Sequence, residues 1–353
     1  MVGPSDAGEL AALVRDGEVV SKLDLSGRDF TGAKLSGGVF EAVDFRGAKL
    51  SGAAMRESVF VECKFDGGDL SGVDLHQAIL GQCSLAEVTM TGARLTATKI
   101  DAVNAPGLDL RGADLRATAF TRGKLAGARM TGAKLERTAF LDCDVAGLDV
   151  TDTKLLAVTL LSADLRQAKL SGAVFERATL IKAKLSGLSL RGMSFVHTQF
   201  TDGELEGCDF TGADLRQANF KGAKLAGSLL TKIDGPNILF VETDLRRVDL
   251  REAKLAQSMF VDAVLDDANC SGADMTSCIL HRATCQRALF LRTELTYADF
   301  AHADLSEADF SGASMFRTNL HQVSDPGARY TDRVRALEGD PELAAAENWR
   351  PKF

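Results

Sequence analysis

Three of the five histidines recur about 20 residues apart near the end of the chain: His281, His302 and His321. Imidazole is a preferred ligand of zinc, copper and nickel, so a fold that stacked these side chains could build a metal site. A solvated surface histidine is the more common situation, and His76 and His197 are isolated in the sequence. We therefore expect five outward histidines and assign no metal ligand.

Seven cysteines offer a second kind of chemistry. An odd number of cysteines without a secretion signal argues against disulfides, and the absence of a CxxC pair argues against a zinc site. The sequence also lacks a Walker loop, HExxH, GxSxG and the dinucleotide fingerprint. We expect no enzyme activity, no catalytic residue and no cofactor.

Composition narrows the class of protein. The 353 residues are 45% apolar, which is too much for a disordered chain, and the net charge of −8 disfavours direct binding to nucleic acid. The first residues, MVGPSDAGEL, lack the basic and apolar regions of a secretory signal, and no apolar run is long enough to cross a membrane. These features predict a cytoplasmic protein.

A five-residue period organises most of the chain. Every fifth residue from Leu25 to Leu320 is called a centre here, and 56 of the 60 centres are Leu, Phe, Met, Val or Ile. The exceptions are Ala105, Gly235, Cys270 and Cys285. The residue two places before each centre is usually small, while the residue between them is often Asp or Lys.

This period belongs to short extended segments. Five residues rotate a helix by about 500°, so a helix would spread the centres over all its faces. Two inward positions separated by one outward position are the alternation of a strand. The residue two places after the centre is often Gly, as in Gly27, Gly32 and Gly47, and predicts a corner with unusual backbone angles. All seven cysteines fall on inward positions, which predicts buried thiols.

The triplets ADL and ANF carry a family resemblance. They occur at Ala113–Leu115, Ala163–Leu165, Ala213–Leu215, Ala303–Leu305 and Ala218–Phe220. In these residues the chain resembles the pentapeptide-repeat family, whose motif is A(D/N)LXX. The resemblance implies an all-β fold: a right-handed quadrilateral parallel β-helix, or solenoid, of about 15 coils with short helical caps at its ends.

The resemblance also suggests a domain organisation. We expect an N-terminal helical cap at 1–20, the β-helix at 21–323 and a helical tail or cap at 324–353. The first helix should span 6–16, and two helices should span about 330–338 and 341–348, with Trp349 anchoring the tail. The segments Asn104–Gly107 and Asp234–Asn237 each contain Pro and should produce bulges or bends.

One face of the predicted β-helix differs from the others. Its centres are mostly Phe, which should stack as an internal ladder, and its outward positions are unusually apolar. A large exposed apolar patch predicts self-association or a partner, although β-branched residues also favour strands in general. The candidate interaction face comprises Val39, Val59, Val61, Ile79, Leu141, Leu161, Ile181, Leu239, Val241, Met259, Val261 and Ile279.

Three functions are consistent with this sequence. The first is a non-catalytic protein-binding scaffold or adaptor, because the segments from Tyr297 to Leu320, Asp340–Leu343 and the end at Trp349 resemble pentapeptide-repeat proteins of bacterial type VI secretion systems. The second is a DNA mimic that binds DNA gyrase, a type II topoisomerase, as quinolone-resistance pentapeptide proteins do. Outward Lys residues interrupt the acidic surface that a mimic needs. The third is another structural or regulatory role. Expected partners are therefore proteins: secretion-system components, a topoisomerase or a second copy of the chain.

Overall fold

The computed structural model describes residues 4–350. It contains two compact units, Met1–Lys184 and Leu185–Phe353, which we call unit 1 and unit 2 and describe separately. Both are built from parallel turns of a β-helix in which a residue pairs with the residue 20 positions later. The two units together hold about 16 turns, close to the 15 expected, and the predicted β-helical fold is confirmed.

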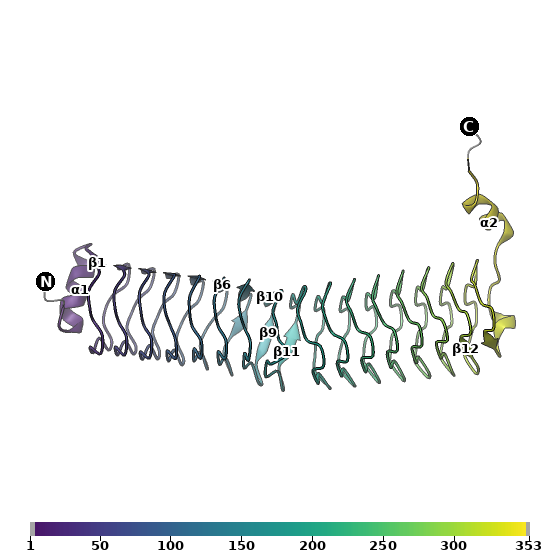
Figure 1. Cartoon of the computed structure of the whole chain (residues 1–353), viewed down its shortest axis with the longest axis horizontal. Helices are drawn as coiled ribbons and strands as arrows, with labels where there is room; N and C mark the ends of the chain where they lie inside the picture. Colours follow the sequence, from purple (N-terminus) through teal and green to yellow (C-terminus); the bar gives the residue numbers. More distant parts are fainter. Residues whose placement is uncertain (1–3, 351–353) are drawn as a thin grey trace. The chain divides into compact units, whose positions relative to one another are not determined.

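Unit 1 begins with helix α1 (Ala7–Arg15) and continues into β-helical turns (Figure 1). Asp6 caps α1 by accepting hydrogen bonds from the N–H groups of Gly8 and Glu9, and Leu10 is fully buried. Eight strands form one parallel sheet in the order β1-β2-β3-β4-β5-β6-β8-β10, and three form a second in the order β11-β9-β7. The strands are β1 Val19–Ser21, β2 Val39–Glu41, β3 Val59–Val61, β4 Ile79–Gly81, β5 Lys99–Asp101, β6 Ala119–Thr121, β7 Leu135–Glu136, β8 Ala139–Leu141, β9 Lys154–Leu156, β10 Thr159–Leu161 and β11 Val174–Glu176.

In unit 2 most pairing is through single parallel bridges. Asp209, for example, pairs with Ser189 on one side and with Leu229 on the other. Two short strands, β12 (Asp309–Phe310) and β13 (Arg329–Tyr330), pair near the C-terminal end. A 3-10 turn, η1 (Arg333–Arg335), and helix α2 (Pro341–Glu347) follow, and both are visible in yellow in Figure 1.

Backbone hydrogen bonds between turns follow the five-residue period of the sequence. The N–H of centre Leu25 donates to the carbonyl of Asp44 in the next turn, and the N–H of Asp44 donates back to Leu23. The residue two places after the centre also donates forward, as Gly27 does to Arg46. That residue is left-handed at nearly all of these corners, with φ of 65° at Gly27 and 51° at Ala42. The predicted corner geometry is therefore confirmed.

At corners such as the one after Leu25, the N–H of the residue directly after the centre does not donate to a backbone carbonyl of the neighbouring turn. An Asp or Asn before the centre often accepts that N–H instead: Ser26 donates to Oδ1 of Asp24 at 3.0 Å, and Lys221 donates to Oδ1 of Asn219 at 2.9 Å. This Asx contact gives a physical reason for the D/N of the motif, since the side chain completes the corner.

The two Pro-containing segments do not bulge, contrary to our expectation. Pro106 and Pro236 stand directly after a centre, where the missing N–H costs the ladder nothing. Ala105 still donates to Lys124 at 2.8 Å, and the carbonyl of Pro106 still accepts from Glu87 at 2.9 Å. The 20-residue register passes through both segments unchanged.

The interior consists of the centres and the small residues two places before them. Phe40 and Phe60 stack with centroids 4.7 Å apart, and Phe120 and Phe140 do so at 5.1 Å, as the predicted ladder requires. Most buried hydroxyls are paired with backbone carbonyls, as in the 2.7 Å bond from Ser58 Oγ to Leu35, although the hydroxyl of Thr198 has no partner. The interior is thus apolar with its polar atoms largely satisfied.

The tail differs in part from expectation. Helix α2 lies where the second tail helix was predicted, but 330–338 is not a helix, because β13 continues the pairing and only η1 follows it. Trp349 is 71% exposed and does not anchor the tail. The division into 1–20, 21–323 and 324–353 remains a prediction. Among the described residues, no helix is both long and apolar enough to cross a membrane.

Candidate interaction surface

The first part of the predicted face lies on neighbouring strands of unit 1. Val39 of β2 pairs with Val59 of β3, which pairs with Ile79 of β4. Their neighbours in the sequence are buried centres, so strand alternation turns these three side chains outward. Ile79 is 42% exposed, and Val61, at the end of β3, is also exposed.

The apolar residues do not form one continuous stripe in unit 1. Leu141 of β8 pairs with Leu161 of β10, and Ile181 follows in the next turn. Lys99 and Asp101 of β5 interrupt the face between Ile79 and these leucines. Unit 1 therefore presents two apolar patches instead of the single stripe that we expected.

Unit 2 carries a third patch. Leu239 pairs with Met259, and Met259 pairs with Ile279, so these side chains lie side by side on consecutive turns. Val241 and Val261 flank them after the centres Phe240 and Phe260. None of the twelve predicted residues is buried, as their phase required. The use of these residues in binding stays a prediction.

Charged side chains elsewhere on the surface are extensively paired. Arg46 lies 2.5 Å from Asp44, Arg111 lies 2.7 Å from Asp109, and Arg246 lies 2.5 Å from Asp244. In each pair the Asp precedes a centre and the Arg follows it, so both project from the same corner. The hydrogen bond from Arg111 holds the pKa of Asp109 below its ordinary value. The acidic positions of these corners therefore carry their own counter-charge.

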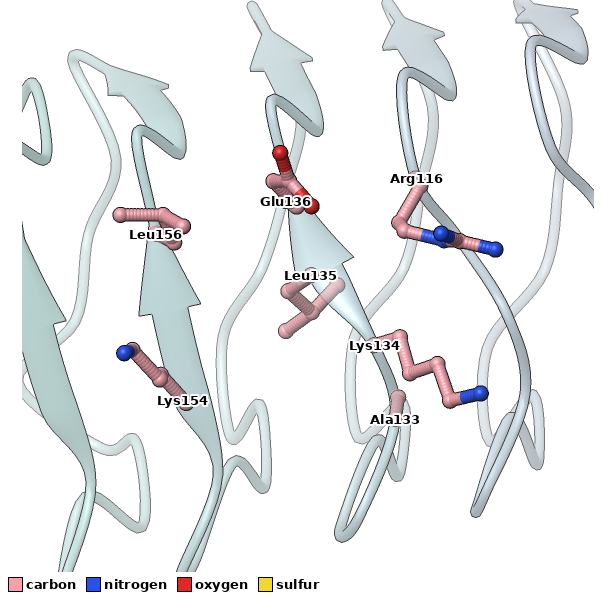
Figure 2. Close-up of a pocket in the computed structure, with 7 residues that line it drawn as sticks. All are labelled: Arg116, Ala133, Lys134, Leu135, Glu136, Lys154 and Leu156. Atoms are coloured by element: carbon pink, nitrogen blue, oxygen red, sulfur yellow. The ribbon is translucent and has the colours of Figure 1, made fainter.

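The described residues of unit 1 line at least two surface hollows. One, of about 340 Å³, is shown in Figure 2, with lining residues from neighbouring turns that include β7 and β9. Its lining consists of Arg116, Ala133, Lys134, Leu135, Glu136, Lys154 and Leu156. The other, of about 270 Å³, is lined by Ala146, Asp164, Arg166 and Gln167. Lys154 is engaged with Glu176 at 3.3 Å, and neither lining contains a cysteine or histidine that could act as nucleophile or base.

The cysteines are inward, as predicted. Six are buried and Cys143 is half-buried, and none forms a disulfide. Burial raises the pKa of Cys208 to about 11 and that of Cys278 to about 12. A thiol that stays protonated at neutral pH is a poor nucleophile, so Cys208 and Cys278 pack instead of reacting.

The histidines differ from expectation at one position. His321 is buried, with 3% of its surface exposed, although its phase predicted an outward side chain. The tail covers it, and Glu347 at the end of α2 lies 3.0 Å from its Nε2. His281 does not join this group and lies 2.8 Å from Asp299 instead.

An exposed aromatic cluster near the end of unit 2 was not singled out from the sequence. The rings of Tyr297 and Phe316 lie edge to face with centroids 5.8 Å apart, and both are exposed. Arg317 lies over Tyr297, and Arg335 lies over Phe316 at 5.2 Å. The sequence did contain a sign of this cluster: Tyr297 and Phe316 stand at corner positions of the five-residue repeat, which face outward, and not at the buried centres. Exposed aromatic and Arg side chains of this kind are enriched at binding hot spots.

Comparison with solved structures found other repeat proteins. HetL, a pentapeptide repeat protein involved in heterocyst differentiation regulation from the cyanobacterium Nostoc sp. strain PCC 7120, is 22% identical, with 70% of this chain and 91% of HetL covered and a TM-score of 0.23. QnrB1, a plasmid-mediated fluoroquinolone resistance protein, is 22% identical over 59% of this chain and 91% of its own, with a TM-score of 0.28. The pentapeptide repeat protein Rfr23 from the cyanobacterium Cyanothece 51142 is 18% identical, with 42% of this chain and 91% of Rfr23 covered and a TM-score of 0.20. The search of curated proteins gave no significant match.

The family model describes most of the chain. The model for pentapeptide repeats matches residues 24–61, 69–104, 103–137, 160–192, 194–231, 243–282 and 283–324. These segments coincide with the five-residue period and with the 20-residue register of the turns. The chain therefore belongs to the pentapeptide-repeat family.

Proposed function

We propose that the protein is a non-catalytic, protein-binding scaffold that engages its partner through the apolar patches of the Phe-ladder face. The observation that carries this proposal is the row formed by Leu239, Met259 and Ile279, whose side chains lie side by side at positions where the other faces mostly carry polar residues. Burying apolar surface contributes about 25 cal/mol per Å², so a partner that covers such a row gains affinity from it. The buried thiols and the chemistry of the two hollows support a role without catalysis.

We further propose that the partner is a component of a bacterial type VI secretion system. The resemblance of the end of the chain to proteins of those systems supports this choice. The exposed cluster of Tyr297, Phe316, Arg317 and Arg335 lies in that same region and offers the partner aromatic and cationic contacts. The adaptor would then use both the apolar row and the aromatic cluster of unit 2.

Replacing one of two matched leucines by lysine tests whether the apolar row binds the partner. Leu239→Lys places a cation in the apolar row, while Leu289→Lys changes an equally exposed leucine, 36% in each case, on a different face. Both side chains precede a buried centre, so both variants should fold with a change in stability within about 0.5 kcal/mol.

The binding assay uses purified protein with co-expressed spike and effector proteins of a type VI system. We expect Leu239→Lys to weaken complex formation at least tenfold and Leu289→Lys to leave it unchanged. Analytical ultracentrifugation of the same proteins checks self-association. Equal behaviour of the two variants in both assays would remove the patch from the proposal.

The gyrase alternative is disfavoured by the surface. A DNA mimic must present uncompensated negative charge, whereas Asp44, Asp109 and Asp244 are each paired with an Arg of the same corner. A supercoiling assay with purified gyrase separates the two functions. Inhibition of supercoiling, or protection from a quinolone, at micromolar protein would favour the alternative over the adaptor.

A further inference from the structure

Two histidines and a glutamate converge where the tail meets the last turns of unit 2. Nε2 of His302 lies 3.5 Å from Oε2 of Glu347, and Nε2 of His321 lies 3.0 Å from the same oxygen. One ligand atom from each of the three residues lies within 4.8 Å of the other two. The imidazole rings stand edge to face, with centroids 5.5 Å apart.

The fold brings these three side chains together from separate elements. His302 and His321 occupy corners of consecutive turns, and the N–H of His302 donates to the carbonyl of His321 at 2.9 Å. Glu347 is the last residue of α2, whose N-cap Asp340 donates its N–H to Nδ1 of His321 at 3.1 Å. His321 is buried, so its orientation is fixed by the turn below and the tail above.

This donor set suits a transition-metal ion of the zinc class. Zinc binds imidazole nitrogen and carboxylate oxygen at about 2.0–2.2 Å in a tetrahedron, which places neighbouring ligand atoms about 3.3 Å apart. The two distances to Glu347, 3.0 and 3.5 Å, bracket that separation. The 3.5 Å between Nε2 of His302 and Oε2 of Glu347 is at the long limit of a hydrogen bond. A metal ion between the imidazole and the carboxylate would therefore hold His302 more strongly than this hydrogen bond does.

We propose that His302, His321 and Glu347 bind a divalent zinc-class ion that fastens α2 to the last turns of unit 2. The two Nε2 atoms and Oε2 supply three ligands, and water completes the fourth position. Gln322 supports the carboxylate from outside the ion's coordination, because its Nε2 donates to the same Oε2 at 3.0 Å. The proposal concerns the tail and is independent of the proposed adaptor function.

The site has a distinctive consequence at Asp340. With Nδ1 of His321 accepting from Asp340, the imidazole carries its proton on Nε2 and donates it to Glu347. An ion at Nε2 requires the other tautomer, with the proton on Nδ1, so the N–H of Asp340 loses its acceptor. Metal binding should therefore speed hydrogen exchange at the amide of Asp340 while it holds the C-terminal end of α2 in place.

The test titrates ZnCl₂ into untagged, chelator-treated, full-length protein by calorimetry. We expect one ion per chain with a Kd in the micromolar range or below, and at least tenfold weaker binding in His302→Ala and Glu347→Gln. His281→Ala is the matched control, because His281 lies in the preceding turn and contacts Asp299 instead of Glu347. It should bind like the unmodified protein.

Two further readouts do not depend on the heat of binding. Trp349 is the one tryptophan of the chain and lies two residues after Glu347, so its fluorescence should change on zinc addition and should not change in Glu347→Gln. Co²⁺ in place of Zn²⁺ should give a spectrum without thiolate-to-metal charge transfer. Absence of binding, binding by His302→Ala and Glu347→Gln as tight as that of the unmodified protein, or a thiolate signal would each overturn the proposal.

Discussion

The rings of Phe40 and Phe60 lie parallel, with centroids 4.7 Å apart and an interplanar angle of 7°. They are centres of successive turns and pair directly in the register of β2 and β3. The next centre in this row is Leu80. The row therefore accepts both an aromatic and an aliphatic side chain of similar size, and its stability should depend on volume more than on aromatic character.

Truncation in this row should accordingly be severe. We expect Phe60→Ala to lower the free energy of unfolding by about 3–5 kcal/mol, because the side chain is fully buried and a cavity remains. Phe60→Leu should cost less than about 2 kcal/mol, since Leu80 shows that leucine fits the adjacent position. Urea denaturation followed by circular dichroism measures both. Equal losses for the two variants would show that ring stacking, not volume, dominates.

The corners allow a separate test of backbone conformation. Gly27 has φ of 65°, and a Cβ added there would meet no atom within 4 Å. Substitution should therefore act through backbone strain alone. We expect Gly27→Ala to destabilise by about 1 kcal/mol, Gly27→Asn by less and Gly27→Val by more, because Asn tolerates left-handed angles and β-branched residues do not. An order of thermal midpoints other than Asn, Ala, Val from highest to lowest would contradict this interpretation.

The repeat phase was sufficient to predict the interior. A centre such as Phe40 is fixed by its place in the five-residue period, and the same phase correctly placed Ile79 at the surface. The same inward and outward positions recur in every turn, so one five-residue pattern predicts the burial of residues along the whole repeat. What covers the apolar rows cannot be obtained from phase, because phase describes one chain and not its partner.

The tail could not be predicted in the same way. The helix expected at 330–338 is absent because Tyr330 stacks on Phe310, with centroids 4.9 Å apart, and so extends the aromatic row by one turn. Arg333 is then held between Asp325 and Glu338. These are contacts between a segment outside the repeat and the last turns, and no periodicity encodes them. The approach of Glu347 to the histidines was missed for the same reason.

Proline should be tolerated at one phase of the repeat and rejected at another. Thr91 follows the centre Met90, the position that Pro106 and Pro236 occupy elsewhere, whereas the N–H of Thr89 donates to Gly68 at 3.1 Å. We expect Thr91→Pro to change the free energy of unfolding by less than about 1 kcal/mol and Thr89→Pro to lower it by about 1–3 kcal/mol through the lost, buried hydrogen bond. The two variants differ by two positions in one turn, so each serves as the control for the other. A larger loss for Thr91→Pro in urea denaturation would refute the assignment of ladder donors.

The paired carboxylates should make stability sensitive to acid. The hydrogen bond from Arg111 lowers the pKa of Asp109, and Arg129 adds to this effect, while Arg46 and Arg246 lower the pKa values of Asp44 and Asp244 in the same way. A carboxyl whose pKa is lower in the folded state contributes its stabilisation above the unfolded value of about 3.9, and that contribution is lost as pH falls through the folded pKa. We therefore expect a constant contribution from these pairs at pH 5–7 and a decline below about pH 4.

Asp109→Asn keeps the shape of the side chain but has no charge to titrate, so the variant should be less stable at pH 7 and should lose less stability than the unmodified protein on acidification. Urea denaturation at a series of pH values measures the difference, and parallel curves for the two proteins would show that the Asp109–Arg111 pair contributes nothing to folding.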